Sequence, residues 1–67
     1  MPEIDVEIDR DGTMFTFTIL SEQAMHWVNE HVQTEYWQWL GPRRLVLDHH
    51  FAGPVYDGML DADLEVR

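Results

Sequence analysis

The sequence contains no cysteine and no lysine, and serine occurs once, at Ser21. The lack of cysteine excludes a disulfide framework and a cysteine-based zinc site. No segment approaches the roughly 20 apolar residues that a membrane span requires, and the first residues lack the basic and apolar regions of a signal peptide. We therefore expect a cytoplasmic protein with no membrane partner. Its 67 residues allow a single domain, 1–67, with one small core.

Positive charge is scarce in this sequence. Four arginines stand against 13 Asp and Glu residues, and the formal net charge is −9. A net charge of about −2 to −8 already keeps a small domain soluble. A larger negative field repels nucleic acid and attracts basic protein surfaces. We therefore expect a basic protein surface as the partner, with no direct binding of nucleic acid. Plain solubility, or adaptation to high salt, is the alternative explanation.

Two segments near the N-terminus have the pattern of β-strands. In residues 3–8, acidic residues alternate with apolar ones, which is the period of a strand with one face in water. Residues 13–20 are rich in aromatic and β-branched residues, which favour strands. Residues 9–12, between the two segments, end in a glycine and have the composition of a turn. Together they predict a β-hairpin.

A helical pattern follows the hairpin. Ser21 is a suitable N-cap, and apolar residues from Ala24 to Val32 recur at helical spacing, so we expect this helix to end near residues 31–34. Residues 35–41 are ambiguous between a short helical turn and an irregular aromatic segment, because their periodicity favours neither.

The second half of the sequence predicts a third strand and a second helix. Residues 44–50 have an apolar centre, and Pro54 suits the first position of a short helix. Residues 64–66 either add a brief last strand or lie outside the sheet. The expected fold class is α+β. A small antiparallel or mixed sheet, made of the hairpin and the third strand, is covered on one face by two helices in the order ββαβα(β).

Carboxylates are the first candidates for a binding site. At every second position of a strand they lie roughly 6.6–6.8 Å apart, about twice the ~3.4 Å rise per phosphate of a nucleic-acid strand. A second pair is four residues apart on the expected second helix, and would share one of its faces. The alternative is two solvated faces, of which the strand face protects the sheet edge from aggregation. The candidate residues are Glu3, Asp5, Glu7 and Asp9 on the strand, and Asp57 and Asp61 on the helix.

Aromatic residues supply the second candidate surface. Trp37 and Trp39 lie two residues apart in the ambiguous segment, and exposed Trp side chains often dominate the energy of protein interfaces. We expect them to anchor a partner. The alternative is that they belong to the core or to the contact of a homodimer, which would then be the function of the protein.

Catalytic and cofactor chemistry have little support. Ser21 is better explained as a helix cap than as a nucleophile, and a chain of this length has little room for a pocket of several hundred cubic ångströms. Asp48, His49 and His50 could form a metal- or pH-responsive site, but no third ligand is identifiable. We expect no catalytic residue, no metal site and no cofactor.

The chain resembles the short inhibitor proteins of phages and mobile elements in its size, its lack of cysteine and its excess of acidic residues. The acidic residues that carry the resemblance are the strand row of Glu3, Asp5, Glu7 and Asp9 and a C-terminal cluster of Asp57, Asp61, Asp63 and Glu65. Anti-CRISPR proteins and other DNA-mimicking anti-defence proteins are examples. The resemblance covers the whole length and rests on no family motif. It implies a non-enzymatic inhibitor that docks on the basic, nucleic-acid-binding surface of a larger effector and occludes it.

Overall fold

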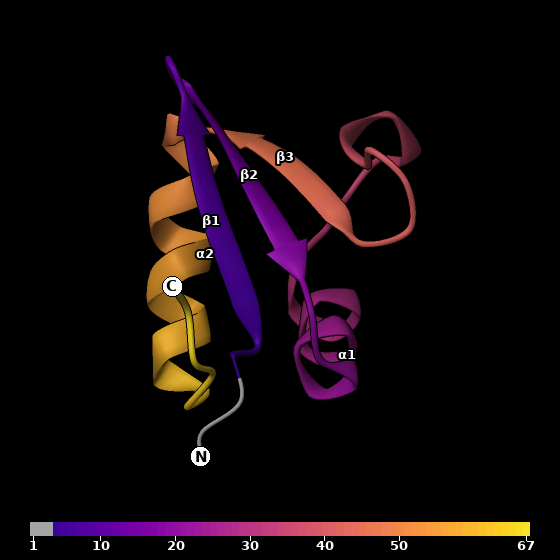
Figure 1. The fold of residues 1–67 in the computed structure, drawn as a ribbon, viewed down its shortest axis with the longest axis vertical. Coiled ribbons are helices and arrows are strands. Elements are labelled where there is room, and N and C mark those ends of the chain that lie inside the picture. The colour runs from indigo at the N-terminus through magenta and orange to yellow at the C-terminus, as the bar shows by residue number, and fades with distance from the viewer. Residues whose placement is uncertain (1–3) are drawn as a thin grey trace.

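The computed structural model describes residues 4–67, which form a three-stranded antiparallel sheet with two α-helices (Figure 1). The α+β class is therefore confirmed, and the sheet is antiparallel rather than mixed. Its strands lie in the order β1-β2-β3. The elements in chain order are β1 (Val6–Asp11), β2 (Met14–Ile19), α1 (Glu22–His31), the short 3₁₀ helix η1 (Tyr36–Gln38), β3 (Arg44–Asp48) and α2 (His49–Asp61).

The hairpin turn lies further along the chain than its composition predicts. Asp9, Arg10 and Asp11 continue β1, with Asp11 opposite Met14, and only two residues connect the strands. Gly12 takes a φ of +64°, as the first residue of a tight hairpin loop requires. Asp9, Arg10 and Asp11 are part of the strand although they are polar, since an exposed strand end can carry polar side chains on both faces of the sheet.

Helix α2 begins at His49, five residues before the start that Pro54 predicts. The N-cap is Asp48, the last residue of β3, whose Oδ1 accepts the backbone N–H groups of His50 (2.9 Å) and Phe51 (3.3 Å). This cap offsets the lost hydrogen bonds of the first turn. Pro54 then lies inside the helix, where its ring removes one backbone donor. The correction matters because it puts Phe51 on the helix.

Both helices cover the same face of the sheet. Side chains from β1, β2 and β3 meet side chains from both helices in one cluster, and its members are Val6, Phe17, Ile19, Ala24, Val28, Leu45, Leu47, Ala52, Met59 and Leu64. The alternation of each strand leaves its other side chains on the opposite, open face of the sheet. In Figure 1 the hairpin lies in front of α2, so the open face is turned toward the viewer.

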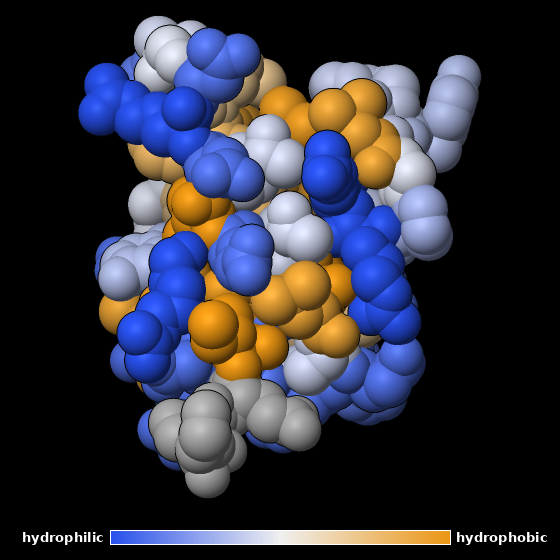
Figure 2. Space-filling view, viewed as in Figure 1, coloured by the Kyte–Doolittle hydropathy of each residue, from blue (hydrophilic) through white to orange (hydrophobic). Residues whose placement is uncertain are grey.

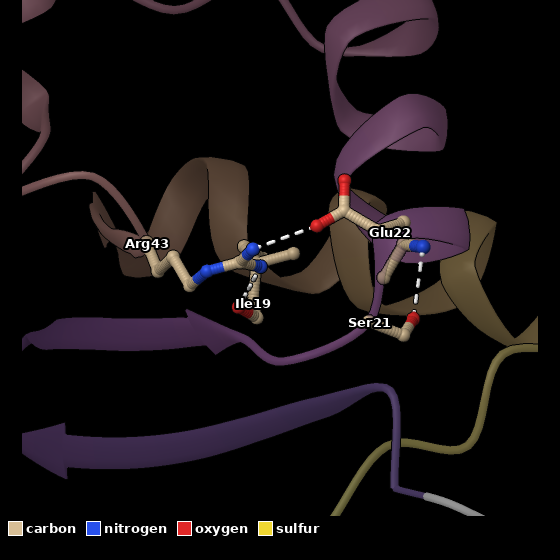
Figure 3. A network of polar contacts seen from close by, with 5 residues as sticks. Ile19, Ser21, Glu22 and Arg43 are labelled. Atoms are coloured by element: carbon tan, nitrogen blue, oxygen red, sulfur yellow. Dashed lines mark hydrogen bonds and ion pairs between the residues drawn. The ribbon is translucent and has the colours of Figure 1, made fainter.

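A polar network joins the hairpin, α1 and the segment before β3 (Figure 3). Nη1 of Arg43 donates to the carbonyl of Ile19 at 3.2 Å, and Nη2 donates to Oε1 of Glu22 at 2.8 Å. The Oγ of Ser21 accepts the N–H of Ala24 at 3.0 Å, so Ser21 caps α1 as expected. These contacts fix where α1 leaves the sheet.

The two ambiguous segments are short and irregular. Residues 35–41 contain the single 3₁₀ turn η1, and Trp39 forms one isolated antiparallel bridge with Leu45. Near the C-terminus, Val66 forms one parallel bridge with Val6, and the N–H of Ile8 donates to the carbonyl of Arg67 at 2.8 Å. The expected last strand is thus a single bridge that covers part of the free edge of β1.

Candidate functional site

Two of the predicted acidic residues of β1 lie on the open face of the sheet. Glu7 and Asp9 are exposed, and Asp11 continues their row. Their cross-strand neighbours on β2 are Thr18, Thr16 and Met14, which carry no charge. Figure 2 shows this face, where hydrophilic side chains lie beside weakly polar and apolar ones. The β1 row is a line of exposed carboxylates beside the uncharged outward side chains of β2, and Arg44 of β3 lies beyond Thr18 on the same face.

Asp5 has a different environment from Glu7 and Asp9. It is half-buried, its Oδ1 accepts a hydrogen bond from Oγ of Ser21 at 2.6 Å, and its Oδ2 accepts one from the N–H of Glu65 at 2.8 Å. Both carboxylate oxygens are thus engaged inside the protein. Glu3, the remaining member of the predicted row, lies outside the described residues.

The two tryptophans of the aromatic segment have separate environments. Trp37 is 68% exposed, beside Tyr36, which is 89% exposed. Trp39 is half-buried against the core, and its Nε1–H donates to Oγ1 of Thr34 at 3.0 Å. Since η1 precedes β3 in the chain and contacts it (Figure 1), Trp37 lies at the opposite margin of the sheet from β1.

Asp57 and Asp61 are exposed on α2. They share a helix face at four-residue spacing, and Met59, between them in sequence, points into the core. Because α2 covers the inner face of the sheet, these carboxylates lie on the far side of the molecule from the β1 row. The fold therefore presents two acidic surfaces rather than one.

An open groove of about 590 Å³ separates α1 from α2. The groove is larger than we expect from so short a chain, which has little room for a hollow of several hundred cubic ångströms. The indole of Trp27 reaches across to α2, where a Cβ on Gly58 would lie 3.0 Å from its Cζ2 atom. The lining residues are Trp27, His31, Val32, Gln33, Gln38, Leu47, Phe51, Pro54, Val55 and Gly58.

The groove connects sites that the sequence leaves apart. Gln38, next to Trp37, lines one side, and Gly58, next to Asp57, lines the other. The Oε1 atom of Gln38 accepts the backbone N–H of Glu35 at 2.7 Å, and this hydrogen bond holds the Gln38 side chain in place. The groove is thus lined by a residue of η1 and a residue of α2 that are next in sequence to Trp37 and Asp57, respectively.

Sequence reasoning missed the α2 wall of the groove, although the sequence carries a signal for it. Phe51, Pro54, Val55 and Gly58 follow the i, i+3, i+4, i+7 spacing of one helix face. The pattern is visible only when the helix begins at His49 instead of Pro54.

The histidine-rich segment is part of the α2 N-terminus. Asp48 is the N-cap, and the rings of His49 and His50 lie 4.1 Å apart between centroids at an interplanar angle of 35°. Across residues 4–67, no group of three or more His, Asp or Glu side chains is placed to hold a metal ion.

No family model, no curated protein and no solved structure matches this chain. Neither helix in the described part of the chain is long and apolar enough to cross a membrane.

Proposed function

We propose that this protein is a non-enzymatic binding module that docks on the basic surface of another protein and occludes it, as the phage-type inhibitors that it resembles do. Basic patches of this kind are the electrostatic footprint of nucleic-acid-binding proteins. A nucleic-acid-binding effector is therefore the partner class that we propose.

The observation that carries the proposal is the unbalanced charge of the two acidic surfaces. Two arginine ion pairs form within residues 4–67, namely Arg43–Glu22 and Arg67–Glu65, and the contact of His26 with Glu30 becomes an ion pair when the histidine is protonated. None of them includes a carboxylate of the β1 row or of the outer face of α2. Exposed carboxylates without a counter-charge speed the approach of a basic partner, because complementary potentials steer diffusional encounter.

Exposed aromatic side chains supply the second support. Trp37 and Tyr36 project from a turn instead of packing into the core. Large, exposed aromatic rings bury much apolar area when a partner covers them, and they are enriched among the residues that dominate binding energy. In this proposal the acidic surfaces speed the association with the partner, and the aromatic residues Tyr36 and Trp37 supply the affinity of the complex.

The experiment is a capture from bacterial lysate with the tagged protein, at roughly 0.1 M and 1 M salt, where the Debye length falls from about 10 Å to about 3 Å. We expect a nucleic-acid-binding protein that is released at high salt and that DNA displaces from the tagged chain. Each acidic surface is then neutralised separately, by Glu7→Gln with Asp9→Asn, and by Asp57→Asn with Asp61→Asn. Asp5 is left intact because both of its oxygens are engaged.

Slower association and a weaker salt dependence in either double variant would support the proposal and identify the surface in use. The matched control is Glu30→Gln, which removes a carboxylate already paired with His26. If both double variants bind the captured protein at the wild-type rate, the proposal is wrong. If the lysate yields the protein itself alone and its mass doubles with concentration, the chain is a self-associating domain instead.

A further inference from the structure

The groove between α1 and α2 has the size and lining of a binding site. Its volume of about 590 Å³ lies within the roughly 300–1,000 Å³ of typical ligand pockets, which are mostly apolar with a few polar groups. Trp27, Leu47 and Val55 supply apolar surface, while His31, Gln33 and Gln38 supply hydrogen-bonding groups. The groove is partly open to solvent rather than enclosed, so a side chain of another molecule can enter it.

The exposure of Phe51 indicates that the groove is a docking surface. This residue lines the groove but is 61% exposed, although nothing about its position on α2 requires a large apolar side chain in water. A side chain inserted between Phe51 and Trp27 would cover both rings. Aromatic residues in such a place are typical anchors of protein interfaces.

The charge beside the groove selects the occupant. Asp57 and Asp61 follow Pro54 and Gly58 by three residues each, so helical geometry places them beside the α2 wall on its solvent side. Neither carboxylate is in an ion pair of the described residues. An apolar groove with an acidic rim fits an apolar side chain flanked by Lys or Arg.

We propose that this groove receives the apolar face of a basic amphipathic helix from the partner protein. Such a helix lays residues at i, i+3, i+4 and i+7 into an apolar groove, and its basic residues meet Asp57 and Asp61 at the rim. This inference rests on the proposed function, and it assigns the docking to the α2 side of the molecule, with the adjoining Trp37 turn as its extension.

A second hollow provides an internal control. A cavity of about 320 Å³ lies between the hairpin and the other side of α2, and Tyr56 lines it at 38% exposure. Tyr56 and Phe51 are thus two exposed aromatic residues on opposite sides of one helix. Replacing each by serine removes a ring without changing the charge.

The test uses a synthetic helical peptide with Leu at i, i+3, i+4 and i+7 and Lys or Arg elsewhere, and a second peptide with Ser in place of Leu. We expect the Leu peptide to shift the NMR signal of the Trp27 indole N–H, assigned by its loss in Trp27→Phe. Phe51→Ser should weaken binding by about tenfold or more, whereas Tyr56→Ser should change it by less than about twofold.

The peptides separate this inference from the proposed function. If the Ser peptide binds as tightly as the Leu peptide and salt weakens both, the groove is not the anchor, but the acidic docking surface remains. If a Leu peptide with Gln at every basic position binds equally well at Trp27, the groove takes apolar helices and the charge-based function is wrong. An unmoved Trp27 signal with a bound Leu peptide also overturns the groove inference.

Discussion

The Oδ1 atom of Asp5 accepts a hydrogen bond of 2.6 Å from Oγ of Ser21, and that same Oγ accepts the N–H of Ala24 at 3.0 Å. One carboxylate therefore orients the N-cap of α1. Its other oxygen holds the C-terminal segment through the N–H of Glu65. Asp5, which directly precedes β1, thus joins that strand to α1 and the C-terminal segment, while Glu7 on β1 is exposed.

We predict that Asp5→Ala lowers the free energy of unfolding by about 1–3 kcal/mol, since it leaves half-buried donors without an acceptor. Asp9→Asn, on the exposed face, should change it by less than about 0.5 kcal/mol. Urea unfolding followed by far-UV circular dichroism measures both. Equal midpoints for the two variants would show that the Asp5 contacts contribute nothing to stability.

The two tryptophans of the aromatic segment should respond differently to truncation. Trp39→Ala removes a ring packed against the core and its hydrogen bond to Thr34, so we expect a loss of about 2–4 kcal/mol. Trp37→Ala removes an exposed ring and should cost less than about 0.5 kcal/mol. Thermal unfolding of the two variants gives the comparison. A Trp37→Ala protein as unstable as Trp39→Ala would place Trp37 in the core.

Gly58 of α2 lies against the indole of Trp27 from α1. A Cβ there would lie 3.0 Å from Cζ2 and 3.1 Å from Cη2 of Trp27. We predict that Gly58→Leu displaces the indole and lowers stability by about 1–3 kcal/mol, because overpacking strains its neighbours. A changed Trp27 indole NMR signal accompanies the loss of stability.

Gly53→Ala is the control for Gly58. No atom lies within 4 Å of a Cβ at position 53, so the effect is that of the backbone alone and should stay within about 1 kcal/mol. A Gly58→Leu protein that unfolds at the same urea concentration as Gly53→Ala would mean that the groove walls move apart freely.

Much of the fold follows from local patterns. Alternation along β1 and the aromatic and β-branched run of β2 are enough to predict the hairpin, because a strand face repeats every two residues. Ser21 predicts the start of α1, because an N-cap needs a short acceptor side chain before an apolar helical stripe. The sequence predicts the wrong start for α2 because Pro54 is a stronger local signal for a first helical position than Asp48 is for an N-cap. The cap at Asp48 consists of hydrogen bonds from the backbone N–H groups of His50 and Phe51, which form only once the chain is helical there.

Composition also determines the chemistry of the surface. A charge of −9 with no lysine and no cysteine is a property of the sequence, whatever the fold. It excludes disulfides within the chain, and it is the basis on which we propose a basic partner. It cannot tell which carboxylates share a surface, because that depends on which side of the sheet each element packs.

Tertiary structure alone decided the arrangement of the candidate site. In the folded chain, Asp5 accepts hydrogen bonds inside the protein, Trp37 is exposed to water, and Trp39 packs against the core. The tertiary structure separated the β1 row from Asp57 and Asp61 by placing both helices on one face of the sheet. It also formed the groove, because Trp27 and Phe51 are 24 positions apart in the chain and line one hollow only when α1 and α2 lie on the same face of the sheet. The periodicity of the sequence shows which face of a helix or strand is apolar. A groove forms where two such faces do not pack completely against each other, and that depends on the tertiary structure.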